Sequence, residues 1–200
     1  MGAYFFVFFL IVVAVIILAK VINRDQVRLN RITPHLEPED KILDLGCGEC
    51  CITRALELKG YQTTGIDIVD AGSCSQPAVY DGEKIPFDDK SFDVSVCAFV
   101  LHHASNYRTL VQELVRVTKR LIIIFEDTPE NKMDRYFNKL HSGSDWGSCK
   151  ECFLTRDEWL TIFDEHGVVE WESIPLMEFP FAGRPWIYPV HKTCFRIYLG

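Results

Sequence analysis

The residues best suited to chemistry begin with a glycine-containing loop after a short apolar run, Leu43-Asp44-Leu45-Gly46-Cys47-Gly48. Glycines in such a turn let the backbone approach a ligand, and the N-terminus of a following helix favours negative charge. Asp67 lies nineteen residues after Gly48, at the end of the next apolar run. A carboxylate there can accept hydrogen bonds from both hydroxyls of a ribose. Together these residues predict a site for a ligand with a ribose and a charged end.

Other interpretations of this pattern stay open at the level of sequence. A G-x-G turn also serves tight packing, and an aspartate is common in surface turns. The same spacing fits a dinucleotide-binding domain. That interpretation is disfavoured because Cys51 stands where the third glycine of the G-x-G-x-x-G pattern is expected.

Two adjacent histidines, His102 and His103, follow a continuous apolar run and are candidates for a general base. Imidazole titrates near neutral pH, which suits proton transfer. Neighbouring side chains point in different directions, so we expect only one of them to face the site. The alternative is a histidine that packs in a loop. Glu126, Asp127 and His141 are weaker candidates at the same rim.

The elements that must position these residues alternate between apolar runs and helical patterns. We expect strands at residues 41–45, 63–68, 76–80, 92–100, 121–125, 168–173 and 193–199. Helices are expected at residues 50–59 and 106–118, and from a capping box at Thr155 and Glu158 to Gly167. This alternation predicts an α/β fold with a doubly wound, Rossmann-like, mostly parallel seven-stranded sheet and helices on both faces. Its ligand lies at the carboxyl ends of the strands.

The order and spacing of several segments resemble a known enzyme family, and these segments are Ile42–Gly48, Gly65–Asp67, Asp81–Phe87, Ser91–Val94 and Phe99–His103. Residues 40–126 are similar to the class I S-adenosylmethionine-dependent methyltransferases, in particular the group with quinone-modifying and other small-molecule enzymes. The resemblance implies S-adenosylmethionine as cofactor and methyl transfer as the reaction. No metal site is predicted.

Carried over residue by residue, the resemblance implies cofactor contacts at Asp44, Gly46, Cys47, Gly48, Asp67, Ile68, Asp81, Gly82 and Leu101. The loop residues would shape the pocket for the methionine part, Asp67 would hold the ribose, and Asp81 would bind the adenine amino group. Leu101 and His102 would lie beside the sulfonium and its methyl group. Cys50 departs from the family, in which a small residue such as glycine is usual, and we expect binding to be retained.

The N-terminal segment is an apolar run that is long enough to cross a bilayer, with Lys20 able to reach the interface. A cleaved signal peptide is disfavoured because no basic residue precedes the run. A buried helix would have to hide apolar side chains on every face. Basic residues follow the span, so we expect a single-pass membrane protein whose catalytic domain faces the cytosol. The predicted parts are a transmembrane anchor at 1–22 (contacting the membrane through 3–22), a juxtamembrane linker and lead-in helix at 23–40, and the methyltransferase domain at 41–200.

Charge and cysteine content narrow the classes of partner. The net charge of the 200 residues is -7, and residues 1–31 carry +3, so the remainder carries -10. An acidic body argues against a nucleic-acid partner, because phosphate binding depends on Lys and Arg. The eight cysteines are interpreted as reduced thiols. Cys149 and Cys152 form a lone C-x-x-C, for which ordinary thiols are favoured over half a zinc site or a redox pair.

The acceptor is the least defined part of the predicted function. Large aromatic residues in the C-terminal part are expected mainly in the core, with an acceptor pocket as the alternative; they are Trp146, Trp159, Phe179, Phe181 and Trp186. The leading hypothesis is methylation of a small, lipid-soluble or membrane-proximal acceptor. Methylation of a membrane-associated protein, and a non-catalytic membrane-tethered scaffold with the same fold, are the alternatives.

Overall fold

A computed structural model describes residues 8–9, 24–70, 78–141, 149, 152–174 and 191–200, without the side chains of residues 78, 137 and 139–141. Among these residues, no helix has both the length and the apolar character needed to cross a bilayer. The predicted span at 3–22 lies outside the described residues except for Phe8 and Phe9. The anchor therefore stays a prediction.

The described part is built around one sheet whose strands are β1 (Lys41–Leu45), β2 (Gln62–Asp67), β3 (Ala78–Val79), β4 (Phe92–Ala98), β5 (Thr118–Asp127), β6 (Val168–Ile174) and β7 (Lys192–Tyr198). Their order in space is β3-β2-β1-β4-β5-β7-β6. The strands from β3 to β5 are parallel, whereas β7 is antiparallel to both β5 and β6. The predicted Rossmann-like α/β architecture is confirmed, but the sequence pattern did not predict the insertion of β7 between β5 and β6.

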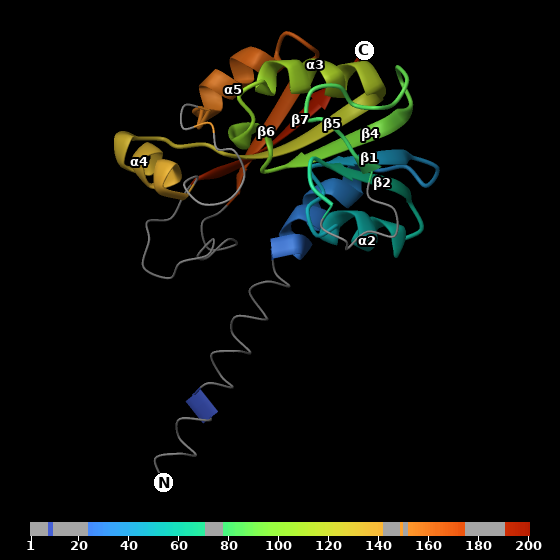
Figure 1. The fold of residues 1–200 in the computed structure, drawn as a ribbon, viewed down its shortest axis with the longest axis horizontal. Coiled ribbons are helices and arrows are strands. Elements are labelled where there is room, and N and C mark those ends of the chain that lie inside the picture. Colours follow the sequence, from blue (N-terminus) through green and yellow to red (C-terminus); the bar gives the residue numbers. More distant parts are fainter. Residues whose placement is uncertain (1–7, 10–23, 71–77, 142–148, 150–151, 175–190) are drawn as a thin grey trace.

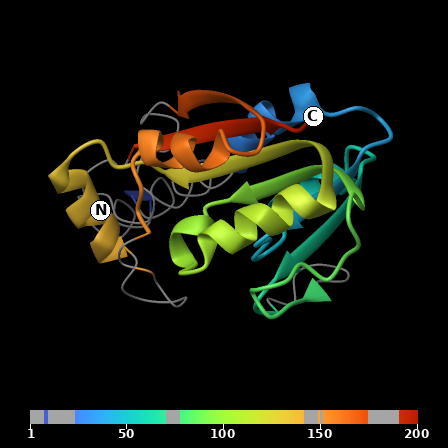
Figure 2. The same cartoon turned by 90° about the horizontal axis from the view of Figure 1, so that it is seen from above.

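Helices cover both faces of the sheet (Figure 1). The helices are α2 (Cys51–Glu57), α3 (Tyr107–Val117), α4 (Lys132–His141) and α5 (Arg156–Phe163), with short 3-10 turns η1 (Thr33–His35) and η2 (Leu101–His103). A further helix spans residues 24–32, inside the predicted lead-in segment. In the two views, α3 and α5 lie over one face and α2 over the other, while α4 follows the end of β5 (Figures 1 and 2).

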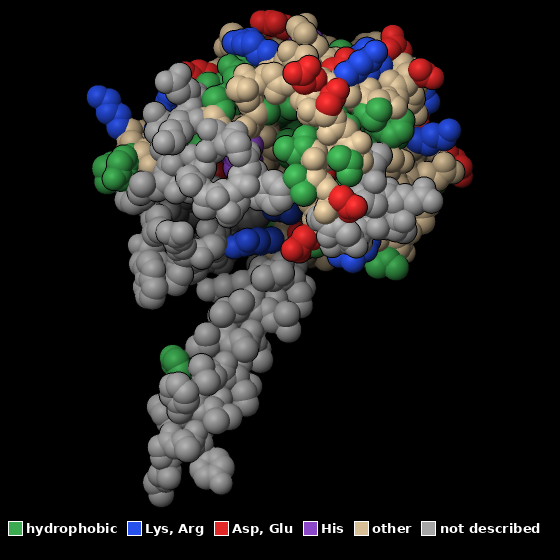
Figure 3. All heavy atoms as spheres, in the orientation of Figure 1, with side chains coloured by type: hydrophobic (Ala, Val, Ile, Leu, Met, Phe, Trp, Pro, Cys, Tyr) green, Lys and Arg blue, Asp and Glu red, His purple; other side chains and the backbone are tan. Residues whose placement is uncertain are grey.

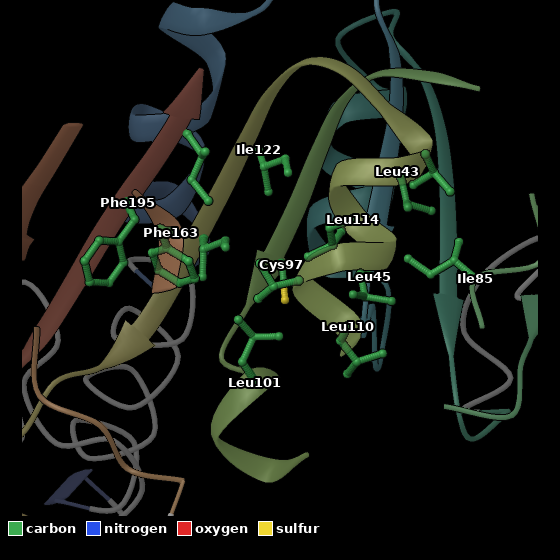
Figure 4. Packing of buried hydrophobic residues seen from close by; sticks show 14 of the residues in the cluster. Leu43, Leu45, Ile85, Cys97, Leu101, Leu110, Leu114, Ile122, Phe163 and Phe195 are labelled. Carbon is green, nitrogen blue, oxygen red and sulfur yellow. The ribbon is translucent and has the colours of Figure 1, made fainter. Parts of the chain in front are cut away.

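Two apolar clusters fill the space between the sheet and these helices. Side chains of α3 and α5 pack with one face of the strands, and Figure 4 shows Leu114 of α3 directed toward Cys97 of β4. On the other face, α2 and the helix at 24–32 pack against alternate residues of the same strands. Strands buried on both faces explain the continuous apolar runs of β4 and β5 in the sequence.

Local signals explain where several elements begin and end. Thr155 and Glu158 form the predicted capping box, in which Thr155 N donates to Glu158 Oε2 at 2.7 Å and Glu158 N to Thr155 Oγ1 at 3.3 Å. The strand expected to reach Val100 ends instead at Ala98. The strand ends there because Phe99 has a φ of 62°, which is outside the extended conformation.

The expectation of reduced cysteines is wrong at Cys50, which is disulfide-bonded, and at a second place. Cys149 and Cys152 form a disulfide, rather than the pair of ordinary thiols expected from the sequence. Their Cα atoms are 5.3 Å apart, a separation that sequence spacing alone does not establish. Within the described ranges, no group of three or more His, Cys, Asp or Glu side chains is arranged to hold a metal ion.

The strand order sets the position of the candidate site. The chain passes from β1 to β2 on one side and reaches β4 on the other, so the order reverses between β1 and β4. Ligands of open α/β sheets bind outside the carboxyl ends of the strands at such a reversal. The loops that follow β1, β2, β4 and β5 therefore form the edge at which the predicted residues must meet.

Candidate active site

Two glycines shape the loop between β1 and α2. Gly46 has a φ of 72° and Gly48 a φ of 50°, values that favour glycine. A Cβ added at Gly46 would lie 2.2 Å from Val100 Cγ2, so a larger residue would displace the segment after β4. A Cβ added at Gly48 would meet no heavy atom within 4 Å. Gly46 therefore allows close packing, whereas Gly48 borders open space beside the loop.

Asp67 connects the end of β2 to this loop. Its Oδ2 accepts a hydrogen bond from Gly48 N at 2.8 Å, and its Oδ1 accepts one from Ile68 N at 2.7 Å. Gly46 N donates to Ile66 O at 2.8 Å, which holds the loop against β2. The sequence-predicted residues Gly48, Asp67 and Ile68 are thus brought together, with the carboxylate facing the glycine loop.

Asp44 is the buried acid of the site. Its Oδ2 accepts hydrogen bonds from Thr53 N at 3.1 Å and from Thr53 Oγ1 at 2.7 Å. Burial raises the pKa of Asp44 to about 6, against the opposing effect of these hydrogen bonds. A cation placed beside this carboxylate would stabilise its ionised form. Asp44 consequently suits the ammonium group of a ligand rather than a carboxylate.

The loop between β1 and α2 carries two cysteines, Cys47 and Cys50, which have different structural roles. Cys50 is the N-cap of α2 and has a φ of 59°, which explains why the resembling family usually has a small residue there. Cys47 Sγ lies 3.4 Å from Cys50 Sγ. Burial raises the pKa of the Cys47 thiol to about 12, so this thiol stays protonated near neutral pH. Cys47 is therefore placed to line the loop and not to act as a nucleophile.

Asp81 and Gly82 lie in the segment after β3. Asp81 Oδ1 accepts hydrogen bonds from the amides of Glu83 and Lys84 at 2.9 and 3.0 Å, and these bonds lower the pKa of Asp81. Gly82 has a φ of 79°, and its carbonyl oxygen accepts a hydrogen bond from Asn106 Nδ2 at 2.9 Å. Asn106, which the sequence did not single out for the site, thus ties the Asp81 segment to the start of α3.

Glu126 provides the central contact of the other half of the site. It is the residue before the last of β5, and its side chain is fully buried. Its Oε1 accepts a hydrogen bond from Leu101 N at 2.8 Å, and its Oε2 lies 2.5 Å from His102 Nδ1. Both carboxylate oxygens therefore hold η2. The sequence analysis ranked Glu126 as a weaker candidate, and 24 residues separate it from His102 along the chain.

His102 is enclosed as well as hydrogen-bonded. Its side chain is buried, and its ring stacks on Phe153 with 4.9 Å between ring centroids. Burial lowers the pKa of His102, but the carboxylate of Glu126 outweighs it, so the pKa is raised above the ordinary 6.5. A carboxylate on Nδ1 favours the proton there in the neutral ring, which leaves Nε2 as the nitrogen that can accept a proton.

His103 occupies a different environment from His102. The two ring centroids are 4.1 Å apart, and His103 is half-buried. The carboxylate of Glu126 lies 2.5 Å from His102 Nδ1 and stabilises the protonated form of that ring. The geometry therefore favours His102 over His103 as the proton acceptor, and the catalytic role of either residue stays a prediction.

The remaining candidates lie elsewhere or outside the described residues. Asp127 forms an ion pair with Lys192, whose Nζ is 4.7 Å from the centroid of the Phe99 ring. Trp159 is buried against Tyr107 and Phe163, as expected of a core residue. The side chain of His141 and the whole of four aromatic candidates are outside the described residues; those four are Trp146, Phe179, Phe181 and Trp186.

Comparison with known proteins supports the resemblance found in the sequence. Residues 43–123, which hold β1, β2 and β4 with the glycine loop and both histidines, match the family described as "Methyltransferase domain". An uncharacterized methyltransferase of Bacillus subtilis, YcgJ, is 26% identical over 172 residues, which are 78% of this chain and 67% of that protein.

Two further matches are a curated quinone methyltransferase and a solved structure. A demethylmenaquinone methyltransferase of Mycolicibacterium gilvum is 32% identical over 113 residues, and the match covers 52% of this chain and 50% of that protein. The chain therefore spans about half the length of this quinone methyltransferase. The crystal structure of a possible histamine N-methyltransferase from Thermotoga maritima has a TM-score of 0.67 at 14% identity, covering 90% of this chain and 92% of that one. At this identity the likeness shows the fold alone.

Proposed function

We propose that the chain transfers a methyl group from S-adenosylmethionine to a small acceptor at an atom that gives up a proton. The observation that carries the proposal is the buried Glu126–His102 pair, which stands next to Leu101 at the edge where the glycine loop and Asp67 meet. A proton-accepting ring fixed beside a cofactor loop is what methylation of a hydroxyl or an acidic carbon requires.

The described residues fit S-adenosylmethionine. The loop is open beside Gly48, a carboxylate faces the loop at Asp67, and Asp44 presents a buried carboxylate whose ionisation a cation would favour. When bound, the cofactor would supply an activated methyl group. Asp67 would hold the ribose, Asp81 the adenine, and Asp44 with the loop the methionine part, as the resemblance implies.

The residues of the chain then account for the rest of the chemistry. Glu126 fixes the orientation of the His102 ring and stabilises the positive charge that the ring acquires, because a buried carboxylate favours imidazolium. His102 Nε2 accepts the proton of the acceptor. Phe153 covers one face of this buried ring with apolar atoms and restricts water around it. Holding the acceptor in line with the methyl group lowers the entropic part of the barrier.

A quinol-like, lipid-soluble acceptor is the substrate class that we favour. Support comes from the relatives, which include demethylmenaquinone and ubiquinone-biosynthesis methyltransferases. A phenolic hydroxyl is acidic enough to give its proton to an imidazole base, and the resulting phenolate can be methylated at its oxygen or at the neighbouring ring carbon. We further propose that residues 3–22 anchor the protein in a membrane with the domain in the cytosol, on the strength of the apolar run and the basic residues after it.

The test is methyl transfer from cofactor labelled with tritium in the methyl group, using membranes and the purified full-length chain. We expect label in the organic extract, and a loss of at least about 100-fold with His102→Ala, in line with the loss of a general base. Label in protein bands would instead support a membrane-protein acceptor. Carbonate extraction and protease protection of the same membranes test the anchor: release by carbonate would contradict it.

A further inference from the structure

Helix α4 carries a buried polar cluster that the proposed proton transfer does not use. Asp134 and Asn138 are fully buried, although these residue types are mostly exposed in proteins. They are four residues apart on one helix and therefore lie on the same face of it. The outer side of α4 carries exposed residues such as Lys132 and Met133, and Figure 3 shows basic and hydrophobic side chains projecting there. The face with Asp134 and Asn138 is therefore the one turned toward the body of the protein.

One side of this cluster lacks hydrogen-bond partners. Asp134 Oδ2 is paired, since it lies 2.9 Å from His191 Nδ1 and accepts from Glu130 N at 3.0 Å. Asp134 Oδ1 and both polar side-chain atoms of Asn138, Oδ1 and Nδ2, are buried and have no partner among the residues that the structure describes. A buried polar atom without a hydrogen bond costs stability, and such atoms are few in native proteins. Three of them on one helix face therefore indicate a place that a polar ligand completes.

The cluster stands at the same edge of the sheet as His102. Helix α4 follows the end of β5, the strand whose Glu126 holds the His102 ring (Figure 1). Arg135 Nη2 of α4 lies 3.3 Å from Glu158 Oε2, which joins α4 to the first turn of α5. Phe153, in the segment that leads into α5, stacks on His102. Helix α4 and His102 therefore border the region beyond the carboxyl ends of the strands, from which the acceptor must approach.

The unpaired atoms select the kind of group that can bind. Asp134 Oδ1 can only accept a hydrogen bond, whereas Asn138 Nδ2 can only donate one. An anion would be repelled by Asp134 and by Glu130, and an ammonium group could not accept from Asn138. A hydroxyl group both donates and accepts, so a single hydroxyl satisfies both residues. The side chains of His191 and Glu130 at the rim are 31% and 56% exposed, which leaves this polar rim in contact with solvent.

From these contacts we propose that Asp134 and Asn138 bind a second hydroxyl group of the acceptor, while the hydroxyl that loses its proton faces His102. This assignment rests on the proposed function, since it concerns the acceptor of the same reaction. A quinol has two oxygens at opposite ends of its ring, so the contact with α4 determines which end reaches His102 and the methyl group. Acceptor specificity is thereby assigned to a helix outside the matched segment 43–123.

The first measurement is thermal unfolding of the purified full-length chain in mild detergent without ligand. Asn138→Leu replaces an unpaired amide with an apolar group of similar size, so we expect the melting temperature to rise by about 2–6 °C. Asn106→Leu is the contrast, because Asn106 Nδ2 donates to Gly82 O at 2.9 Å and the loss of that bond should lower the melting temperature. A lower melting temperature for Asn138→Leu, or its failure to fold, would show that the fold itself uses the amide and would overturn the assignment.

The second measurement is calorimetric titration of two probes into the full-length chain saturated with S-adenosylhomocysteine, under argon. 1,4-Dihydroxynaphthalene has two opposite hydroxyls, whereas 1-naphthol has one. We expect wild type to bind the diol at least about tenfold more tightly, and Asn138→Leu or Asp134→Asn to reduce this preference to less than about threefold. The control Lys132→Gln, at an exposed position of α4, should keep the full preference.

Each other result of the titration overturns the assignment in a distinct way. An unchanged preference in both variants would remove α4 from the acceptor site, and equal weakening of both probes would show that the cluster only supports the fold. Wild type that binds S-adenosylhomocysteine but does not prefer the diol, or binds neither probe, refutes the hydroxyl site and leaves the cofactor assignment standing. Failure of folded wild type to bind S-adenosylhomocysteine refutes the proposed function itself.

Discussion

The buried carboxyl of Asp44 makes stability depend on pH in a direction that can be tested. Its pKa is about 6 in the folded chain against an ordinary 3.8. The folded chain therefore holds the proton more tightly than the unfolded chain, so the free energy of unfolding falls as pH rises from about 4 to above 6 and then levels off. Asp44→Asn removes this titration while keeping an oxygen that can accept from Thr53.

The magnitude follows from the two pKa values. Ionising Asp44 reduces the free energy of unfolding by about 1.6 kcal/mol at pH 5 and about 3 kcal/mol at pH 8, relative to the protonated form. The stability of Asp44→Asn relative to wild type should therefore be about 1.4 kcal/mol more favourable at pH 8 than at pH 5. A hydrogen bond weakened by the asparagine shifts both values equally and leaves this difference intact.

Urea unfolding of the full-length chain at the two pH values measures the difference. Asp88→Asn, an exposed carboxylate, is the matched control, and its effect should be the same at both pH values within about 0.3 kcal/mol. A relative stability of Asp44→Asn that is equal at both pH values, or smaller at pH 8, would refute the burial argument. The same variant should bind S-adenosylmethionine more weakly, because the carboxylate opposite the ammonium group is lost.

The remaining predictions concern the loop, the histidine and one helix. Gly46→Ala should destabilise the fold by about 1–3 kcal/mol and abolish cofactor binding measured by calorimetry, because the added Cβ has no room. The control Gly60→Ala, also at positive φ but with no atom within 4 Å of the added Cβ, should retain binding. Glu126→Gln should lower the pKa of His102 and move the acid limb of the kcat/KM profile to lower pH; an unmoved limb excludes His102 as the base. The pair of Glu126 with protonated His102 should stabilise the fold below about pH 6.5, and this stabilisation should fade as pH rises through the raised pKa of His102. Thr155→Ala should cost about 1 kcal/mol in thermal unfolding through loss of the capping box, and a cost near zero would contradict that contact.

Much of the fold was predictable because its signals are local. Each of three signals is encoded within a few residues. They are the apolar runs of β4 and β5, the glycine at position 46 that lets the loop approach Val100, and the capping box at Thr155. The positions of Asp44 and Asp67 at strand ends follow from the same runs. These local signals are sufficient to place the cofactor loop at the switch between β1 and β4.

Other parts depend on contacts between distant segments and were therefore missed or underestimated. The pairing of Glu126 with Leu101 and His102 arises only when β4 and β5 lie side by side. The place of β7, the disulfide of Cys149 with Cys152, and the pairing of Asp134 with His191 likewise require the tertiary arrangement. Sequence spacing can suggest the residue types for these contacts but not the partners.

Calorimetric titration of S-adenosylmethionine into the full-length chain tests the proposed cofactor most directly, with Asp67→Ala as the comparison. The contacts of Asp67 with the glycine loop predict saturable binding in the micromolar range that is lost or weakened at least about tenfold in the variant. Absence of binding by folded wild-type protein, or equal binding by wild type and Asp67→Ala, would contradict the assignment of this edge of the sheet as the cofactor site.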